Sequence, residues 1–399
     1  MLSERELFFR HLAPTSDSPL ALEIDHAEGI YLFGPNGKSY IDLISGISVS
    51  SVGHLHPHVV KAITDQLGKY MHLMVFGEYI QSPQVRLAEK LASLLPPALQ
   101  SCYFVNSGSE AIEGALKLAK RYTGRTKICS FMNAYHGSSH GALSVMGNES
   151  FKRAFRPLLP DVHQLEFNNL TEIARIDERT ACVLVEPIQG EAGIIPATPE
   201  FLAALRKRCD QTGTLLIFDE IQTGFGRTGN LFAFEKYCVI PDILTLAKAM
   251  GGGMPIGAFI SSESIMNSLS HSPVLGHITT FGGHPVSCAA ALATLEVLIN
   301  ENLAAQVKEK EMLIKELLSD HPLVKEIRSG GLLMAIELPD FETNKRVIDK
   351  AIEKGVIVDW FLFNPQSMRI APPLIISKEQ ITTACKTILE AMDEVLSGC

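Results

Sequence analysis

Short apolar runs alternate with amphipathic stretches along the middle of the chain. From about residue 80, each run carries apolar side chains at successive positions, which is typical of strands buried on both faces of a parallel sheet. Between several runs the apolar positions follow the helical period, as in residues 110–122 and 199–212. The pattern predicts an α/β domain, with strands at 102–105, 127–131, 181–188, 214–219 and 242–246.

The two ends of the chain have a different pattern of apolar and polar residues. Near the start, apolar segments at 29–33 and 38–43 flank Pro35-Asn36-Gly37, which predicts a hairpin. After about residue 295, helical stretches at 303–319 and 378–396 enclose strand-like segments at 332–338 and 356–358. We expect a smaller α+β domain at 296–399, an N-terminal segment at 1–50 that packs with it, and a large domain at 51–295.

Composition and charge exclude several classes of protein. The chain has 399 residues, of which 46% are hydrophobic and 20% charged, enough to bury a large core with a smaller one beside it. No apolar run is long enough to predict a membrane span, and the first residues lack the order of a secretion signal, so we expect a cytoplasmic protein. The net charge of -9 includes no basic block, which argues against nucleic-acid binding.

The eight cysteines never form a CxxC pair, which argues against a zinc site and against a disulfide framework. We expect no metal site, and we expect most of the cysteines to be reduced core residues.

Chemically active residue types stand where predicted strands end, which is where open parallel sheets bind their ligands. One strand ends at Asp219, another is followed by Lys248, and a third leads into Asn106-Ser-Gly-Ser-Glu110. The last segment opens a helix, whose free amides and dipole favour a phosphate. Each feature alone also fits a helix cap or a solvated side chain. Together, a phosphate anchor, an acid and an amine nucleophile are the parts that a pyridoxal-phosphate site needs.

Five longer motifs make the sequence recognisable: Asn106-Ser-Gly-Ser-Glu-Ala, Glu186-Pro-Ile-Gln-Gly-Glu-Ala-Gly, Phe218-Asp-Glu-Ile-Gln-Thr-Gly-Phe-Gly-Arg-Thr-Gly, Ala247-Lys-Ala-Met-Gly-Gly-Gly and Thr280-Phe-Gly-Gly-His-Pro. With them, the chain resembles the class III branch of fold-type I pyridoxal-phosphate (PLP) aminotransferases, the ornithine, acetylornithine and ω-amino-acid type. The resemblance covers almost the whole chain. It implies a large domain with a mostly parallel sheet covered by helices, and a smaller α+β C-terminal domain.

The resemblance also implies roles for individual residues around the cofactor. Lys248 resembles the lysine that carries PLP as a Schiff base and then moves the substrate proton. Asp219 resembles the partner of the ring nitrogen, Gln222 the partner of the phenolic oxygen, and Tyr135 the aromatic residue that stacks on the ring. Glu186 is expected to support Asp219 or the neighbouring loop.

The phosphate is expected to contact three residues, two of them at one helix start. Gly108 and Ser109 are the phosphate ligands that the resemblance implies within the chain. Thr280 resembles a threonine that reaches the phosphate of the other subunit. The resemblance therefore implies a homodimer with shared active sites.

Two further residues resemble the family's substrate site. Arg369 matches the arginine that binds the substrate α-carboxylate, and Glu191 matches the glutamate that pairs with this arginine when an ω-amine is bound. The chain departs from the pattern at Ser138, where ornithine and acetylornithine enzymes usually carry an arginine for the other carboxylate. A serine cannot form that bidentate ion pair, so the sequence leaves the identity of the amino donor open.

The sequence thus predicts a PLP-dependent aminotransferase that moves an amino group from an ornithine-like compound, acetylornithine or another ω-amino donor to 2-oxoglutarate. An aminomutase or a lyase on the same scaffold is the alternative, and dependence on an amino acceptor separates it from a transaminase. A non-catalytic relative is a third hypothesis, disfavoured by the intact Lys248, Asp219 and phosphate motif.

Overall fold

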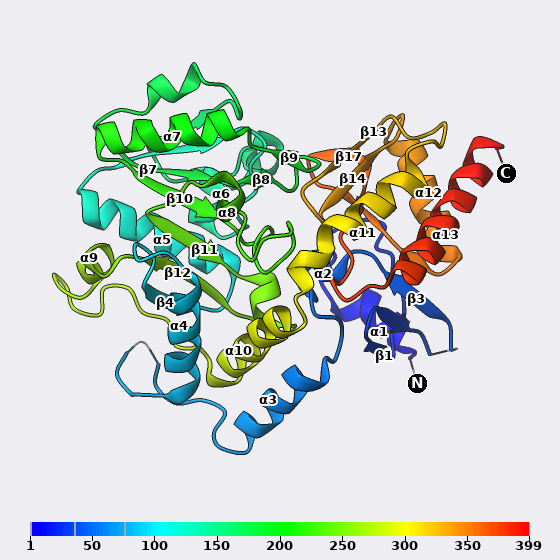
Figure 1. The fold of residues 1–399 in the computed structure, drawn as a ribbon, viewed down its shortest axis with the longest axis horizontal. Helices are drawn as coiled ribbons and strands as arrows, with labels where there is room; N and C mark the ends of the chain where they lie inside the picture. Colours follow the sequence, from blue (N-terminus) through cyan, green and yellow to red (C-terminus); the bar gives the residue numbers. More distant parts are fainter. Residues whose placement is uncertain (1, 36, 76, 399) are drawn as a thin grey trace.

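The computed structural model describes residues 2–35, 37–75 and 77–398 and consists of two lobes (Figure 1). One lobe is built around a seven-stranded sheet, and the other holds smaller sheets together with both ends of the chain. Asn36, in the predicted N-terminal turn, and Cys399 lie outside the described residues.

The large sheet is mostly parallel, as the sequence predicts. Its strand order is β4-β12-β11-β10-β7-β5-β6, and only β12 runs antiparallel to its neighbours. The strands are β4 (Ser101–Val105), β12 (Gly257–Ser261), β11 (Ile243–Leu246), β10 (Leu215–Asp219), β7 (Thr180–Val185), β5 (Lys127–Phe131) and β6 (Val162–Leu165).

Both faces of this sheet are buried, which explains the apolar runs without alternation. In β10, Leu215 and Ile217 belong to the cluster beneath α5 (Gly108–Thr123), whereas Leu216 and Phe218 point into a second cluster. That second cluster includes side chains of α7 (Pro199–Thr212) and α10 (Pro285–Asn300). Helices therefore cover the sheet on both sides, and the carboxyl ends of its strands form an open edge.

In the large sheet, one predicted strand is too long, and two strands were not predicted. The run at 181–188 ends as β7 at Val185, because Pro187 has no amide hydrogen to continue the ladder. The next two residues form β8 (Ile188–Gln189), which pairs with β9 (Ile195–Pro196). The short strands β6 and β12 escaped prediction, although β12 is buried at every position.

The second lobe contains two four-stranded sheets. An antiparallel sheet of order β13-β14-β17-β16 is packed against helices. The other sheet begins with the N-terminal β1, β2 and β3, and β15 joins it in parallel beside β3. The elements are β1 (His26–Glu28), β2 (Tyr31–Phe33), β3 (Ser39–Asp42), β13 (Glu326–Ser329), β14 (Met334–Glu337), β15 (Val356–Ile357), β16 (Asp359–Phe361), β17 (Asn364–Ile370), α11 (Leu303–Leu318), α12 (Phe341–Glu353) and α13 (Lys378–Leu396).

The remaining α-helices and 3-10 helices complete the chain. These are α1 (Glu4–His11), α2 (Ser45–Ser48), α3 (Pro57–Leu67), α4 (Ser82–Leu94), α6 (His140–Val145), η1 (Glu149–Phe151), η2 (Arg153–Phe155), η3 (Glu172–Arg175), α8 (Phe234–Tyr237), η4 (Lys248–Gly251), α9 (Glu263–Met266) and η5 (Asn267–Leu269).

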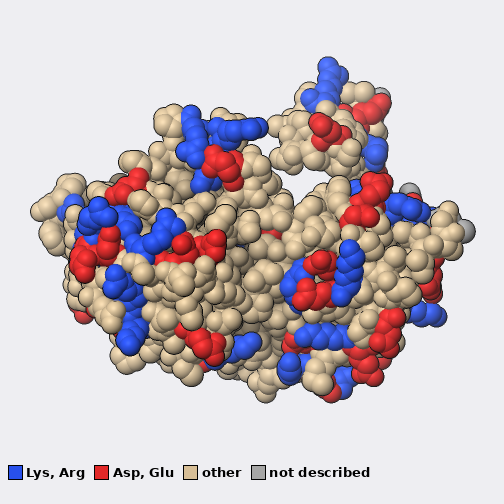
Figure 2. All heavy atoms as spheres, turned by 90° about the horizontal axis from the view of Figure 1, so that it is seen from above, with Lys and Arg blue, Asp and Glu red and all other residues tan. Residues whose placement is uncertain are grey.

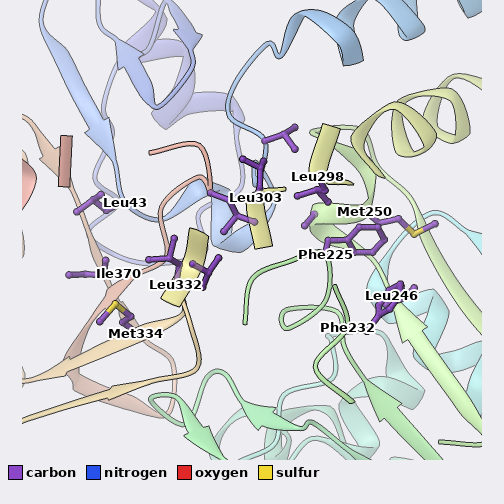
Figure 3. Packing of buried hydrophobic residues seen from close by; sticks show 14 of the residues in the cluster. Leu43, Phe225, Phe232, Leu246, Met250, Leu298, Leu303, Leu332, Met334 and Ile370 are labelled. Atoms are coloured by element: carbon purple, nitrogen blue, oxygen red, sulfur yellow. The ribbon is translucent and has the colours of Figure 1, made fainter. Parts of the chain in front are cut away.

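The lobes share one continuous core. In Figure 3, Leu246 and Met250 near the large sheet, and Met334 and Ile370 in the antiparallel sheet, belong to the same cluster. Leu298 and Leu303 lie in this cluster on either side of the 67° bend between α10 and α11.

Charged side chains of both signs are interspersed over the face shown in Figure 2, without a large field of one sign. Among the described residues, no single helix is long and apolar enough to cross a membrane. The bent pair formed by α10 and α11 is together long and apolar enough, by length and composition alone.

Candidate active site

A cavity of about 400 Å³ lies at the carboxyl ends of β4, β10 and β11. It brings together most of the residues that the motifs single out for a cofactor. Its lining consists of Val49, Asn106, Ser107, Gly108, Ser109, Tyr135, His136, Gly137, Glu186, Asp219, Ile221, Gln222, Ala247, Lys248, Gly253, Met254, Pro255 and Ile256.

Lys248 begins η4 directly after β11 and Ala247, and its backbone is left-handed with φ 48°. Burial lowers the pKa of Lys248 to about 8, and the positive charge of Arg369 acts in the same direction. The negative charges of Glu191 and Asp219 partly oppose the shift. The amine is therefore partly neutral near physiological pH, as a nucleophile or a general base requires.

Asp219 is the last residue of β10 and is 4% exposed. Its Oδ2 lies 2.7 Å from Nδ1 of His136, and its Oδ1 accepts a hydrogen bond of 3.0 Å from the amide of Ile221. His136 is itself buried, and its Nε2 has no hydrogen-bond partner among the described residues. The histidine thus fixes the orientation of the carboxylate. Sequence reasoning missed His136, since only the fold brings it next to Asp219.

Glu186 is a second buried acid near Asp219. Burial and the negative charge of Asp219 raise the pKa of Glu186 well above its usual value, which favours the neutral form. Its carboxyl oxygens accept hydrogen bonds of 3.1 Å from the amides of Tyr135 and Gly190. Glu186 therefore ties the Tyr135 loop to the turn that follows β7.

An anion-binding cradle lies at the start of α5. Ser107 caps the helix by accepting a hydrogen bond from the Glu110 amide, while the amides of the first turn, including Gly108 and Ser109, have no acceptor within a helix. Gly137 passes close above this turn with φ 121°, and a Cβ there would lie 2.1 Å from Oγ of Ser109. The amide of Ser138 donates to the same Oγ at 3.3 Å.

Tyr135 and Gln222 line the same cavity as the cradle and the buried acids. The hydroxyl of Tyr135 lies 3.3 Å from Oγ of Ser138, which is exposed. Gln222 donates from Nε2 to Oε1 of Glu191 at 3.2 Å, and its own Oε1 has no partner among the described residues. Gln222 thus connects the cavity to the residues behind it.

Outside the cavity lining, Arg369 and Glu191 form a buried ion pair with Nη2 and Oε2 2.8 Å apart. Glu191 also accepts a hydrogen bond of 3.1 Å from the Leu362 amide. Further neighbours of Arg369 were not predicted: Oδ1 of Asp359 lies 3.3 Å from Nε, the Trp360 carbonyl accepts a hydrogen bond of 3.3 Å from Nη2, and the Phe361 ring centroid lies 4.6 Å from the guanidinium carbon. Nη1 of Arg369 is buried and has no hydrogen-bond partner among the described residues.

Thr280 lies apart from this group. It is exposed on the segment before α10 and does not line the cavity of its own chain. A role for Thr280 at a phosphate therefore requires a second copy of the chain.

The described residues fit the cofactor that the motifs imply. The cradle offers amides to a phosphate, Lys248 offers an amine to an aldehyde, and Asp219 offers a negative charge to a ring nitrogen. The unpartnered Oε1 of Gln222 and Nε2 of His136 are polar atoms at the same cavity. Burial without a partner is costly for such atoms, which indicates that a bound group completes the site.

Known proteins resemble this chain over almost its whole length. The family model described as aminotransferase class-III matches residues 12–392. A transaminase from the marine bacterium Virgibacillus superposes with a TM-score of 0.93 at 29% identity, covering 99% of both chains.

Two further solved structures are similar to this chain over nearly its whole length. An ornithine aminotransferase from Toxoplasma gondii, described with partial occupancy of PLP at its active site, has a TM-score of 0.89 at 30% identity, covering 99% of this chain and 95% of that one. The adenosylmethionine-8-amino-7-oxononanoate aminotransferase from Methanocaldococcus jannaschii has a TM-score of 0.90 at 30% identity and covers 98% of both chains.

Proposed function

The chain belongs to the class-III aminotransferases, and from this premise we propose that it moves an amino group from an ω-amino donor to a 2-oxo acid. Enzymes of this class depend on PLP, and this chain is a PLP-dependent transaminase. An ornithine-like compound or acetylornithine is among the donors to test, and 2-oxoglutarate is the acceptor that the sequence predicts. The observation that carries the proposal is the buried pair of Arg369 and Glu191 behind Lys248.

The residues of the cavity have separate roles in the proposed reaction. When bound, PLP supplies the electron sink that lets a proton leave the substrate carbon bearing the amino group. Lys248, with its lowered pKa, holds or releases that proton at Nζ. Asp219, oriented by His136, keeps a negative charge at the ring-nitrogen end of the cavity. Glu186 in its neutral form adds no second charge there.

The Arg369–Glu191 pair supports the use of two unlike substrates in turn. When the donor has no carboxylate at this place, Glu191 neutralises Arg369 and no buried cation is left unpaired. When a 2-oxo acid enters, its carboxylate can take Arg369 and replace Glu191. Gln222 lines the cavity and donates a hydrogen bond to Glu191, so this exchange would also change the hydrogen bonding of the cavity wall.

We also propose that the active unit is a homodimer in which Thr280 reaches the partner's cradle. Around Thr280 the surface is unusually apolar, and the rings of His72 and Phe281 lie 4.9 Å apart, which places two exposed segments side by side. Large exposed apolar patches of this kind mark interfaces. On residues 71–75, 77–80 and 274–281, the exposed apolar side chains are Met71, Leu73, Met74, Tyr79, Ile80, Val274, Leu275, Ile278 and Phe281.

The experiment that tests the transaminase function is a spectral half-reaction. The PLP-loaded protein is mixed separately with ornithine, acetylornithine, lysine, 4-aminobutyrate, β-alanine, putrescine and glutamate, and the yellow absorbance of the lysine-bound cofactor is followed. We expect at least one donor to bleach the band and a 2-oxo acid to restore it. Lys248→Ala is the control, because it lacks the amine and should show no such cycle.

The other outcomes separate the alternatives. Product formed without any acceptor would establish lyase chemistry, and an isomerised product with no net amino transfer would establish an aminomutase. If no donor bleached the band and no product formed, the proposed function would be wrong.

A further inference from the structure

The backbone is strained beside the cavity, at α2. Four consecutive residues have left-handed φ values: Ser45 at 50°, Gly46 at 59°, Ile47 at 63° and Ser48 at 63°. Only the glycine adopts this conformation without steric cost, and β-branched Ile47 adopts it least readily. Residues in such conformations persist only where the surrounding structure holds them, and they concentrate at functional sites.

Hydrogen bonds fix this turn between the catalytic lysine and the substrate arginine. The Ser45 amide donates to Oδ1 of Asp42 at 2.8 Å, and its hydroxyl donates to the carbonyl of Ala371 at 2.7 Å. Ala371 follows directly after β17, the strand that carries Arg369. On its other side the turn contacts η4, which begins at Lys248. The turn therefore touches both the segment after Arg369 and the segment that begins at Lys248, and it lies between the lobes (Figure 1).

The turn leads directly into a wall of the cavity. Val49 follows it, and the Val49 amide donates to the Ser45 carbonyl at 2.8 Å. Val49 and residues 253–256 form an uncharged and mostly apolar part of the cavity lining. Among the described residues, no arginine lines the cavity, and Arg369 behind it is already paired with Glu191.

We propose that the strained turn is a specificity device that holds Val49 against the cavity, so that the enzyme selects amino donors with an uncharged, apolar tail. The inference rests on the proposed transaminase function. A carboxylate held against Val49 and Met254 would lose its water there and would meet no arginine among the described residues that line the cavity. The same wall ranks the acceptors: pyruvate, whose single carboxylate needs only Arg369, should serve better than 2-oxoglutarate.

The first test compares donors matched in length. We expect n-butylamine to react about ten- to a hundredfold faster than 4-aminobutyrate in kcat/KM, because an unpaired carboxylate loses a charge-assisted hydrogen bond. If 4-aminobutyrate were the better donor while the half-reaction cycle persisted, the inference would be overturned and the transaminase function would stand. If neither these amines nor the other donors reacted, the transaminase function itself would fall.

The second test measures binding without turnover. Trp360 is the sole tryptophan and its carbonyl accepts a hydrogen bond from Nη2 of Arg369, so its fluorescence can report ligands at the arginine. In the holoenzyme we expect butyrate to bind more tightly than glutarate, which adds a second carboxylate. Val49→Lys should tighten glutarate by about tenfold, whereas Val49→Met, of similar reach but neutral, should not. Equal effects of the two variants would overturn the role of charge at this wall.

The third test addresses the strain. Ile47→Gly relieves a left-handed β-branched residue, and Cys238→Gly is the matched control, since Cys238 is exposed at the end of α8 with φ 53°. Both variants should keep Tm or raise it by about 1–2 °C. Only Ile47→Gly should narrow the preference for n-butylamine over 4-aminobutyrate, by about threefold or more, because Val49 loses its fixed position. An unchanged preference in Ile47→Gly would overturn the role of the turn.

Discussion

At the scale of single residues, the environment of Lys248 sets its chemistry. Burial lowers the pKa of this lysine to about 8, so about one amine in ten is neutral at pH 7, against about one in three thousand for an ordinary lysine. The neutral amine is the form that attacks an aldehyde or accepts a proton. Desolvation thus activates the residue.

This shift predicts how the apoenzyme takes up its cofactor. Below pH 8 the lysine is mostly protonated, so the rate of covalent PLP attachment should rise by about tenfold from pH 6 to pH 7 and level off above pH 8. Stopped-flow absorbance of apoenzyme mixed with PLP measures this rate. Lys248→Ala has no covalent step, so its PLP binding should not follow the profile. A rate still rising at pH 10 would contradict the lowered pKa.

The sequence points to some residues of the site and cannot reveal others. Lys248 and Asp219 are predictable because a charged residue after an apolar strand lies at the ligand-binding edge of a parallel sheet. His136 and Asp359 are not predictable in this way. Their contacts with Asp219 and Arg369 join parts of the chain that only the fold brings together.

At the scale of elements, the start of α5 and the loop above it form one unit. Gly137 comes so close to Ser109 that a Cβ would lie 2.1 Å from Oγ. The loop and the helix are therefore shaped around each other, and the amides of the first turn stay accessible to an anion.

Gly137→Ala should consequently weaken PLP retention by about tenfold or more, because the added methyl group separates the loop from the cradle. Equilibrium dialysis against PLP measures this loss. Gly124→Ala is the control at the opposite end of the same helix, where φ is 69° and a Cβ would meet no atom within 4 Å. It should lower stability by about 1 kcal/mol and leave PLP binding unchanged. Similar PLP loss in both variants would assign the effect to strain alone.

The elements that the sequence predicts are those with a strong local signal. The five predicted strands of the large sheet are recognisable because apolar residues follow one another in them and are buried or half-buried, and α5 and α7 follow the helical period. Strand β12 follows a glycine-rich segment and spans only Gly257–Ser261. Its pairing with β4, which lies more than a hundred residues earlier, depends on the fold and is encoded by no local pattern.

At the scale of the whole molecule, Arg227 joins three parts of the chain. Its guanidinium is fully buried and donates to the carbonyls of Leu332 and Pro372, and also to Oγ of Ser51 at 2.8 Å. Burial lowers the pKa of Arg227 to about 9. Backbone carbonyls thus hold a buried cation at the junction of the lobes.

Arg227→Met should lower the free energy of unfolding by about 3 kcal/mol, because three buried acceptors lose their donor. Denaturation in urea at a fixed protein concentration measures the change. Arg208→Met is the control, since half-buried Arg208 donates to the carbonyl of Ile176 at 2.7 Å within one lobe, and it should cost only about 1 kcal/mol. Equal losses in the free energy of unfolding would show that the position of Arg227 at the junction of the lobes adds nothing to its contribution.

The parallel pairing of β15 with β3 also has a consequence during synthesis of the chain on the ribosome. Ile41 of β3 pairs with Val356 of β15, which is synthesised 315 residues later. At roughly 5–20 residues per second, that interval lasts on the order of 15 to 60 s. During this time one edge of β3 has no neighbour, and an open strand edge is a template for wrong partners. Synthesis in the cell therefore exposes the nascent N-terminal hairpin to aggregation, and a chaperone that shields it would improve the yield of folded enzyme.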